Sequence, residues 1–365
     1  MTPRIETLTA IPIVDLRDGG TVGRAGTARD RAFALRDECI SFLPRAAIAA
    51  LPLIDGITRR WLLRSRSPYT GEIAAIAATL GCPGIWFLNG CFQWGCTSLA
   101  RAQDDTPWLL RTLDWPFPGL GRHLEVQRMH GPAGEFHNVG WPGYVGALTA
   151  SAPGRFAAAI NQAPLRRRTR HPWLRPYDMA LNAMRTWRIR HVPPDHLLRE
   201  VFETCGDYGE ARHRLETTPV ARPVIYTLAG CAPEERCVIE RTVEDFTTRT
   251  DITAASNDWL QCQPSWEARV SANVMFTRSY EDSAANSRTR REQLWAGQGR
   301  VAGDPFRWVT PPVLNRYTRL AVEMCPARGE LRALGYECAN EADLPSPATA
   351  MCEVSQFTKA AMVLP

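Results

Sequence analysis

Residues 89–115, NGCFQWGCTSLARAQDDTPWLLRTLDW, decide how the rest of the chain is interpreted. The sequence changes in texture at Cys96: apolar residues at helical spacing precede it, and short apolar runs bounded by turn residues follow it. We expect helices over residues 29–65 and 68–80. Further helices are expected over about 177–191, 195–216 and 281–296, and strands over 108–113, 124–129, 144–148, 155–160, 224–228 and 237–239. The sequence therefore predicts one layered domain of helices and strands.

Cys96 stands in a local sequence that suits an intramolecular acyl shift. Gly95 leaves the preceding carbonyl sterically open, and the hydroxyls of Thr97 and Ser98 can hold a strained turn. Cleavage of the Gly95–Cys96 peptide would give Cys96 a free α-amine, which titrates near a pH of about 7.7 to 8.0 in model peptides. The nucleophile would then carry its own base. Because none of the 7 histidines is near Cys96 in sequence, a Cys-His pair would need one brought in by the fold.

Composition excludes several familiar classes of site. The chain has 365 residues, a net charge of +5 and 43 basic residues, of which Lys359 is the only lysine, so a P-loop is excluded. HExxH and CxxC motifs are absent, and we expect no metal and no cofactor. Arginine clusters such as that at Arg166–Arg168 are interpreted as solvated faces, and no nucleic-acid partner is expected.

The first 30 residues lack the basic start and the apolar run of a secretory signal, and no apolar stretch is long enough for a spanning helix. The odd count of 11 cysteines leaves at least one thiol unpaired within the chain. These observations predict a cytoplasmic protein.

Five ordered blocks resemble the N-terminal-nucleophile cysteine amidases of the acid ceramidase and N-acylethanolamine acid amidase group, within the choloylglycine hydrolase superfamily. The blocks are CTSLARAQDDTPWLLRTLDW (96–115), GYVGALTASAPGRFAAAINQ (143–162), PVIYTLAGCAPEERCVIER (223–241), ASNDW (255–259) and PPVLNRYTRLAVEM (311–324). The resemblance covers roughly residues 70 to 335. It implies an α+β fold, a four-layer αββα sandwich of the N-terminal-nucleophile hydrolase type.

The resemblance also implies catalytic roles. Cys96 would attack an amide carbonyl, and Arg111 would raise its thiolate fraction from that of a free thiol, whose pKa is about 8.5. Asp114, three residues beyond Arg111, projects elsewhere along the strand and would orient the α-amine of the nucleophile. Asn257 would donate to the developing oxyanion, a contact worth about 3 to 4 kcal/mol of barrier. Arg269 would be a further active-site arginine.

Four residues are candidates for binding the substrate. Asn161 and Gln162 match an Asn-Glu pair near the substrate amide, but glutamine here replaces the acid. Trp94 and Trp115 flank the nucleophile segment, and Trp94 is one of several aromatic residues that could line a lipid tunnel. For most of these aromatic residues, a plain core role is the alternative.

The leading hypothesis is an amidase that hydrolyses an N-acyl amide, such as a fatty-acyl amide or a ceramide-like lipid, through a thioester on Cys96. Autocleavage would divide the single domain into an α-subunit, residues 1–95, and a β-subunit, residues 96–365. The α-subunit is either removed or retained, and where it is retained the two cleaved chains associate. The alternatives are an N-acyltransferase that uses the same acyl-enzyme and a non-catalytic homologue. Transient contact with a membrane that holds the substrate is a further expectation.

Overall fold

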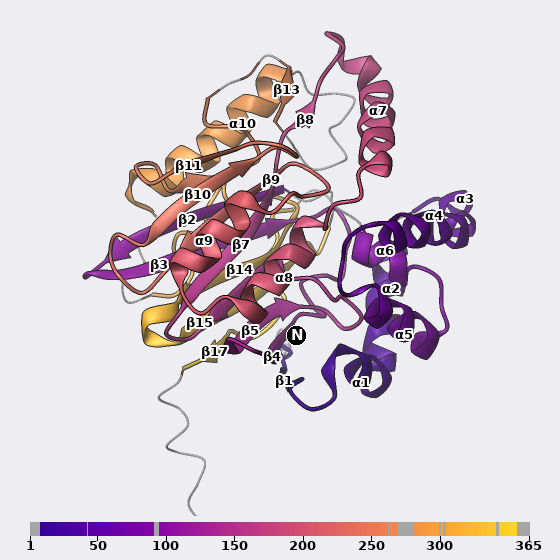
Figure 1. Ribbon diagram of the computed structural model, residues 1–365, viewed down its shortest axis with the longest axis horizontal. Coiled ribbons are helices and arrows are strands. Elements are labelled where there is room, and N and C mark those ends of the chain that lie inside the picture. Colours follow the sequence, from indigo (N-terminus) through magenta and orange to yellow (C-terminus); the bar gives the residue numbers. More distant parts are fainter. Residues whose placement is uncertain are drawn as a thin grey trace, which may run out of the picture.

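The computed structural model describes residues 8–41, 43–90, 95–261, 263, 265–268, 280–298, 301, 304–340 and 343–355. Two β-sheets pack face to face within these residues, and β2 and β3 of one sheet contact β7 and β9 of the other (Figure 1). Small residues on β7, among them Ala157 and Ala159, are fully buried in the core between them. This double sheet forms the centre of the molecule.

The first sheet has eight described strands in the order β1-β4-β5-β6-β7-β9-β10-β11. β1 pairs in parallel with β4, and the other neighbours are antiparallel. The strands are β1 (Ile13–Asp15), β4 (Glu125–Gly131), β5 (Gly134–Gly140), β6 (Thr149–Ala152), β7 (Phe156–Gln162), β9 (Val224–Ala229), β10 (Arg236–Arg241) and β11 (Phe246–Arg249).

The second sheet runs β12-β2-β3-β14-β15-β16, with β17 also paired to β15. Its strands are β12 (Ala254–Ala255), β2 (Gly95–Gln103), β3 (Thr106–Asp114), β14 (Thr318–Cys325), β15 (Glu330–Glu337), β16 (Ser346–Pro347) and β17 (Cys352–Val354). A separate small pair joins β8 (Leu165–Arg166) to β13 (Trp266–Glu267).

Helical layers cover the outer faces of both sheets. α8 (Pro194–Thr204) and α9 (Tyr208–Thr217) pack on the first sheet, and α10 (Tyr280–Gln293) packs on β2 and β12 of the second. The segment after α10 adds Phe306 and Trp308 to the core on that outer face. The predicted α+β fold, a four-layer αββα sandwich, is confirmed.

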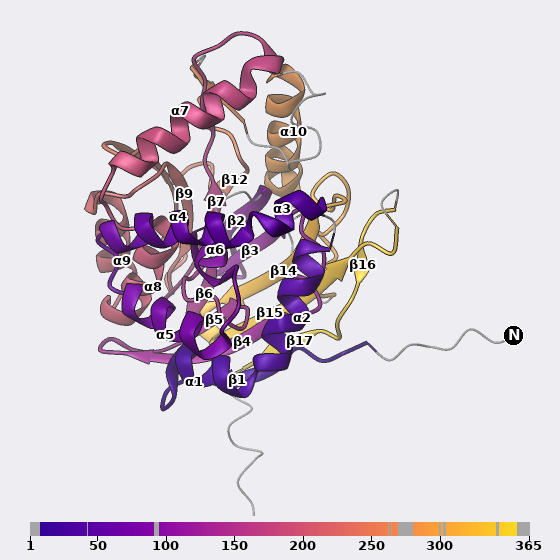
Figure 2. The same cartoon turned by 90° about the vertical axis from the view of Figure 1, so that its right-hand side faces the viewer.

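The remaining helices lie beside the sandwich. Figure 2 shows the N-terminal group of helices facing the viewer across the edges of both sheets, with α7 above it. They are α1 (Gly20–Thr27), α2 (Arg29–Ile40), α3 (Arg45–Ala49), α4 (Leu51–Arg64), α5 (Thr70–Leu80), α6 (Ile85–Gly90) and α7 (Arg175–Arg188). Among the described residues, none of the helices has the length and apolar character needed to span a bilayer.

Most elements expected from the sequence are confirmed, and the differences have local causes. Residues 144–148 are not a strand, because the Asn89 side chain takes up the backbone groups of Gly143 and Val145, and Ala147 donates to the Asp195 carbonyl. The helix expected over 195–216 is two helices, since Asp207 caps the start of α9 by accepting from the backbone of Glu210. The turn expected at Thr97 and Ser98 is part of strand β2.

One close backbone crossing joins the second sheet to the turn after β3. A Cβ atom built on Gly335 would lie 2.0 Å from the carbonyl oxygen of Gly121. We expect Gly335→Ala to lower the free energy of unfolding by about 2 kcal/mol or more, because neither backbone segment can yield cheaply. Gly23→Ala is the matched control: it lies within α1 with nothing within 4 Å of the new atom, and helix propensity favours alanine by up to about 1 kcal/mol. Urea denaturation measures the free energy of unfolding of both variants. Equal values for the two would contradict the steric effect expected at the Gly335–Gly121 crossing.

Candidate active site

Strand alternation fixes the surroundings of Cys96. In the antiparallel β2–β3 pair, Gly95 lies opposite Asp114, Cys96 opposite Leu113 and Ser98 opposite Arg111. Residues that face each other across a pair share a face, and neighbours along a strand alternate. Cys96 and Arg111 therefore point between the two sheets, whereas Asp114 points to the outer face beneath α10.

Arg111 contacts the Cys96 thiol in the space between the two sheets. Its Nη2 lies 3.2 Å from Cys96 Sγ and donates to the carbonyl of Ile160 at 3.1 Å, while Nη1 bonds Thr149 Oγ1. Both Cys96 and Arg111 are fully buried. A guanidinium removed from water needs such partners, so β6 and β7 of the first sheet are tied at this point to β2, the strand that carries Cys96.

Asn257 and Arg290 hold the main chain of Cys96 from the other side. Asn257 Oδ1 accepts from the backbone nitrogen of Cys96 at 2.8 Å, and its Nδ2 donates to the carbonyl of Gln162 at 2.9 Å. Arg290, on α10, donates to the Cys96 carbonyl and to Thr97 Oγ1, each at 2.8 Å, and to Asn257 Oδ1 at 3.1 Å. The uncut Gly95–Cys96 peptide is thus held on its nitrogen side.

Asp114 is buried and satisfied by polar neighbours. Its carboxylate accepts from Asn315 Nδ2 at 2.8 Å and Thr318 Oγ1 at 2.9 Å, and it lies 3.5 Å from Arg290 Nη1. Burial nevertheless raises the pKa of Asp114, and the nearby Arg290 charge opposes that shift. Asp114 does not bond the Cys96 nitrogen in the uncut chain, where Asn257 has that place.

The pKa of the Cys96 thiol is raised, because burial disfavours the thiolate and Asp114 adds to the effect. Arg111 acts in the direction expected from the sequence and lowers the pKa, but desolvation is the larger influence. The uncut chain therefore holds Cys96 as a protonated thiol near neutral pH.

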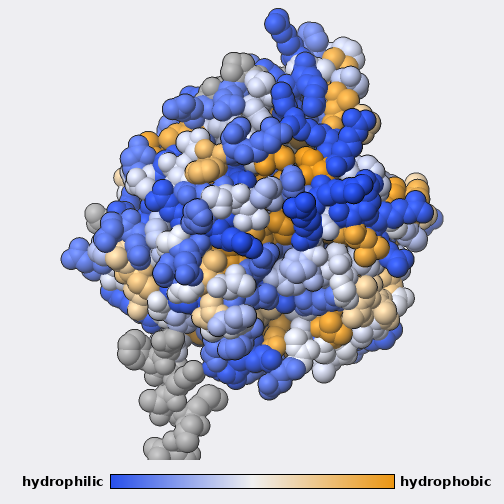
Figure 3. All heavy atoms as spheres, in the orientation of Figure 1, coloured by the Kyte–Doolittle hydropathy of each residue, from blue (hydrophilic) through white to orange (hydrophobic). Residues whose placement is uncertain are grey.

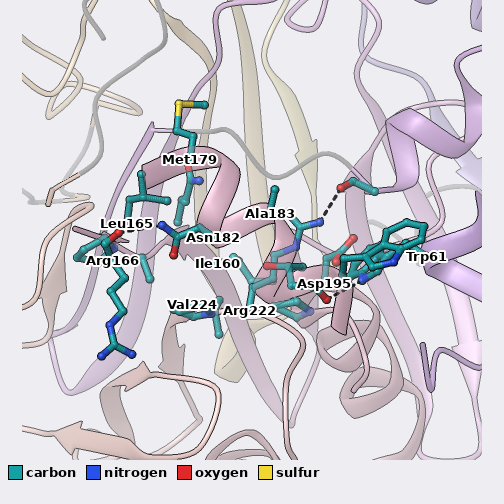
Figure 4. A pocket seen from close by; sticks show the side chains of 18 of the residues that line it. Trp61, Ile160, Leu165, Arg166, Met179, Asn182, Ala183, Asp195, Arg222 and Val224 are labelled. Carbon is teal, nitrogen blue, oxygen red and sulfur yellow. Dashed lines mark hydrogen bonds between the residues drawn. The ribbon is translucent and has the colours of Figure 1, made fainter. Parts of the chain in front are cut away.

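Asn161 and Gln162 end strand β7 beside these groups. Asn161 is fully buried, and its Nδ2 donates to the carbonyls of Ala255 and Ser256, which braces the segment that carries Asn257. Gln162 lines a cavity of about 360 Å³ bounded by α4, α7, the start of α8 and β9. Figure 3 shows hydrophobic atoms exposed between α7 and the N-terminal helices, and Figure 4 shows the cavity with Trp61 and Arg166 at opposite sides.

Trp115 lines a second and almost wholly apolar cavity. It is buried, and its neighbours there include Leu35 and Ile40 of α2 and Leu88 of α6. The volume of this cavity is about 80 Å³. Because Trp115 follows Asp114 directly, this cavity lies between the end of strand β3 and the N-terminal helices.

Two of the sequence candidates, Trp94 and Arg269, lie outside the described residues. Sequence reasoning did not single out Arg290, although this residue is 2% exposed and contacts the main chain of Cys96. It belongs to a strongly polar helix, NSRTRREQ, in which arginine is normally solvated, so only the packing of α10 on β2 identifies it. Asn315 and Thr318 are in the fifth ordered block, which was the available signal for them.

Metal ligands are not assembled here. Within the described part of the chain, no group of three or more His, Cys, Asp and Glu side chains is placed to hold a metal ion.

No protein-family model matches the chain. An N-acylethanolamine-hydrolyzing acid amidase of Oryctolagus cuniculus is 29% identical over 183 residues, 48% of this chain and 48% of that protein. A probable acid ceramidase of Caenorhabditis elegans is 21% identical over 296 residues, 75% of this chain and 71% of that protein. The chain thus spans about half the length of the first of these relatives.

Among solved structures, a Caenorhabditis elegans N-acylethanolamine-hydrolyzing acid amidase ortholog has a TM-score of 0.47 and 16% identity, and the match covers 71% of this chain and 100% of that one. The chain is similar in sequence to N-acylethanolamine-hydrolyzing acid amidases and acid ceramidases, the group that its ordered sequence blocks resemble.

Proposed function

We propose that the chain is an amide hydrolase in which Cys96, released as an N-terminal residue, is the nucleophile. The observation that carries this proposal is the arrangement around one residue: Arg111 contacts its sulfur, while Asn257 and Arg290 contact its main chain. Each of these groups suits one part of acyl transfer, and the named relatives hydrolyse amides.

Cleavage of the chain would begin with attack of Cys96 Sγ on the Gly95 carbonyl. The carbon–sulfur bond forms, the carbon–nitrogen bond breaks, and the thiol proton passes to the leaving nitrogen of Cys96. Water then hydrolyses the thioester and releases residues 1–95 with a new carboxylate. Asn257 Oδ1 already accepts a hydrogen bond from that nitrogen at 2.8 Å, so it supports the new α-amine in place.

Turnover would use the same atoms on an external amide. The α-amine of Cys96 takes the thiol proton, and the Arg111 guanidinium stabilises the thiolate. Sulfur attacks the amide carbonyl, the amine leaves with a proton, and water releases the acid from the thioester. Asn257 Nδ2 is the proposed donor to the oxyanion; it lies in the uncut chain against the Gln162 carbonyl.

The two cavities support an N-acyl lipid as substrate. The apolar cavity beside Trp115 has the lining of a site for an acyl chain, and the larger cavity beside Gln162 mixes polar and apolar groups. N-acyl amides combine an apolar acyl arm with a polar amine arm, and the linings of the two cavities match these arms in polarity.

Exposed apolar side chains lie on or beside two of the helices that bound the larger cavity. On α4 they are Leu53, Ile57 and Leu63, and near α7 they include Trp173 and Tyr177. Arginines are close in sequence to both sets, at 59, 60, 64 and 66 and at 166, 167, 168 and 170. An apolar surface with cationic neighbours supports the proposal of transient contact with an anionic bilayer.

The two halves would remain together after cleavage. Tyr69 OH donates to Glu203 at 2.7 Å, Arg199 pairs with Glu72 at 2.9 Å, and Ser67 Oγ lies 2.7 Å from His196 Nδ1. These pairs join the N-terminal segment to α8 across largely buried surfaces. Such contacts support a complex of residues 1–95 with residues 96–365.

Intact-mass measurement and N-terminal sequencing test the proposed nucleophile. Protein aged at pH 4.5 and at pH 7.5 is expected to yield a chain that begins with Cys96 and to release free acid from N-acyl amides without added amine. Cys96→Ala is expected to stay uncut and inactive. Turnover by Cys96→Ala would refute the proposal, and acyl release that depends on an added amine acceptor would identify an acyltransferase instead.

Arg290 is proposed as a positioning residue for the cleavage step. We expect Arg290→Met to slow formation of the cut chain at least tenfold, because the Cys96 carbonyl and Asn257 lose a shared donor. Arg290→Lys should restore part of the rate, since it keeps the charge beside Asp114. In the uncut Cys96→Ala background, Arg290→Met should lower the free energy of unfolding by about 3 kcal/mol.

Arg288→Met is the control for Arg290, because it makes the same change at an exposed position on the same helix. Its rate of cleavage should match that of the parent chain. A cleavage rate for Arg290→Met equal to that of Arg288→Met would show that the contacts to Cys96 do not position the peptide.

His196 should make the junction of the two halves sensitive to acid. Burial lowers its pKa below the ordinary value of about 6.5; Asp195 opposes this shift and Arg199 adds to it. The unfolded chain then binds the proton more readily, so stability present above pH 6.5 is lost as pH falls below it. We expect His196→Gln to reduce the slope of unfolding free energy between pH 7 and 5, by up to about 1.4 kcal/mol per pH unit.

The control is His213→Gln, at an exposed position on α9. Denaturant titrations of the uncut Cys96→Ala chain at pH 5, 6 and 7 give the slopes. If the His196 and His213 variants have the same slope as the parent, protonation of His196 does not weaken the junction.

A further inference from the structure

An irregularity in strand β14 sets which side chain lies opposite Asp114. Leu320 pairs with Leu113, but the register shifts between Thr318 and Leu320, so Thr318 takes the place opposite Asp114. In a regular ladder that place, and the same face of the sheet, would belong to Arg319. An extra residue of this kind re-aims the side chains around it. The bulge therefore puts a neutral hydroxyl beside the carboxylate where the regular register would put a guanidinium.

Arg319 is held by other partners. Its Nε donates to the carbonyls of Trp115 and Phe117, each at 3.0 Å, and its Nη1 lies 3.1 Å from Glu337 Oε2. The residue is 5% exposed, so these contacts take the place of water around its charge. The charge of Arg319 is thus spent on the segment that follows β3 and on β15.

The turn before β14 supplies a donor to each oxygen of Asp114. Asn315 Nδ2 donates to Oδ2 at 2.8 Å, and Thr318 Oγ1 donates to Oδ1 at 2.9 Å. The same two side chains fix the turn. Asn315 Oδ1 accepts from the backbone nitrogen of Tyr317 at 3.1 Å, and Thr318 Oγ1 accepts from that of Asn315 at 3.0 Å. Both donors are neutral, so they orient the carboxylate without cancelling its charge.

The charge of Asp114 is left to act on Arg290. Among the described residues, Arg290 is the cationic side chain within 4.0 Å of Asp114, with Nη1 3.5 Å from Oδ2. The same nitrogen donates to the Cys96 carbonyl and to Thr97 Oγ1, each at 2.8 Å. It therefore lies between the carboxylate and the main chain of Cys96. A change in the direction of the carboxylate would change the position of the atom that holds Cys96.

The two donors also help to keep Asp114 charged. The residue is 2% exposed, and burial raises its pKa. Arg290, then the hydrogen bonds from Asn315 and Thr318, and finally Arg111 on the opposite face of β3 lower the pKa. A protonated carboxyl would attract Arg290 much less than a carboxylate does. Loss of one donor therefore weakens both the orientation and the charge of this group.

We propose that Asn315 and Thr318 are positioning residues for cleavage before Cys96, and that they act by holding the Asp114 carboxylate against Arg290. The inference rests on the proposed amidase function and goes beyond it, because it assigns a role to a turn that lies two strands away from β2. Both residues act through other side chains and not on the reacting atoms.

Asn315→Asp separates the donor from the turn. Its Oδ1 can still accept from the Tyr317 backbone, but Asp114 keeps a donor only while the two carboxyl groups share a proton. Above that range both are charged and draw Arg290 away from the Cys96 carbonyl. We expect the cleavage rate, relative to the parent, to lie within about threefold at pH 5 and to be at least about tenfold lower at pH 8. Intact-mass measurement over time gives both rates.

Asn340→Asp is the matched control. Asn340 is exposed, and its Nδ2 donates to Asp343 Oδ2 at 2.9 Å, so the variant makes the same change beside a carboxylate on the surface. Its cleavage rate should equal that of the parent at both pH values. A loss in Asn315→Asp that is the same at pH 5 and pH 8, or rates equal to those of Asn340→Asp, would overturn the proposal.

Thr318 is tested by two substitutions. Thr318→Val removes the hydroxyl and should slow cleavage at least about fivefold, because a buried carboxylate oxygen loses its donor. Thr318→Ser keeps the hydroxyl and should recover at least half of the parent rate. Equal rates for the valine and serine variants would overturn the role of Thr318.

Failure of the proposed function has a different signature. A parent chain that stays uncut and releases no acid from N-acyl amides at either pH refutes that function, and hydrogen exchange then decides the role of Asn315. In the Cys96→Ala background at pH 8, the amides of residues 96–98 should exchange at least about tenfold faster in Asn315→Asp than in Asn340→Asp, with strand β10 unchanged. Equal exchange in the two variants, or faster exchange in β10 as well, would overturn the positioning role.

Discussion

The rest of this structure depends on two buried guanidinium groups, those of Arg111 and Arg290, which contact strand β2 from its opposite faces. A guanidinium away from water needs several acceptors, and few positions in a sandwich offer them. Arg111, between the sheets, uses a sulfur, a hydroxyl and a carbonyl from three strands. Arg290, on the outer face, uses a main-chain carbonyl, a hydroxyl and an amide oxygen. Cys96 lies between the two, so its side chain and its main chain are restrained by different layers of the fold.

This arrangement connects the surroundings of Cys96 to the wall of the larger cavity through strand β7. The two carbonyls at the end of β7 that accept from Arg111 and Asn257 belong to residues whose side chains line that cavity. A displacement of β7 on ligand binding would therefore alter the acceptors available to Arg111. The same piece of backbone therefore borders both the thiol and the larger cavity, and it is buried from Phe156 to Asn161.

The sequence predicts the parts of this design that depend on local pattern. Alternation along β3 is enough to separate Arg111 from Asp114, and apolar spacing locates most helices before Cys96. Residues 144–148 are apolar enough for a strand, yet a side chain distant in sequence, Asn89, takes up their backbone groups. The sequence does not identify Arg290 for a related reason. Its helix is polar, and the burial of its side chain depends on how α10 packs on β2. Contacts between segments far apart in the chain decide both cases, and periodicity contains no information about them.

The contacts of the Cys96 main chain also suit the proposed cleavage. Burial raises the pKa of the Cys96 thiol, and the scissile peptide nitrogen already donates to Asn257 Oδ1. When that nitrogen becomes an amine, it gains protons to donate and a lone pair to accept one, while its oxygen partner stays where it is. Arg290, which bonds both the Cys96 carbonyl and Asn257, restrains the new terminus from the next layer. In the proposed cleavage, the residues that hold the peptide beforehand would therefore also orient the base afterwards, and maturation would need only the loss of one covalent bond.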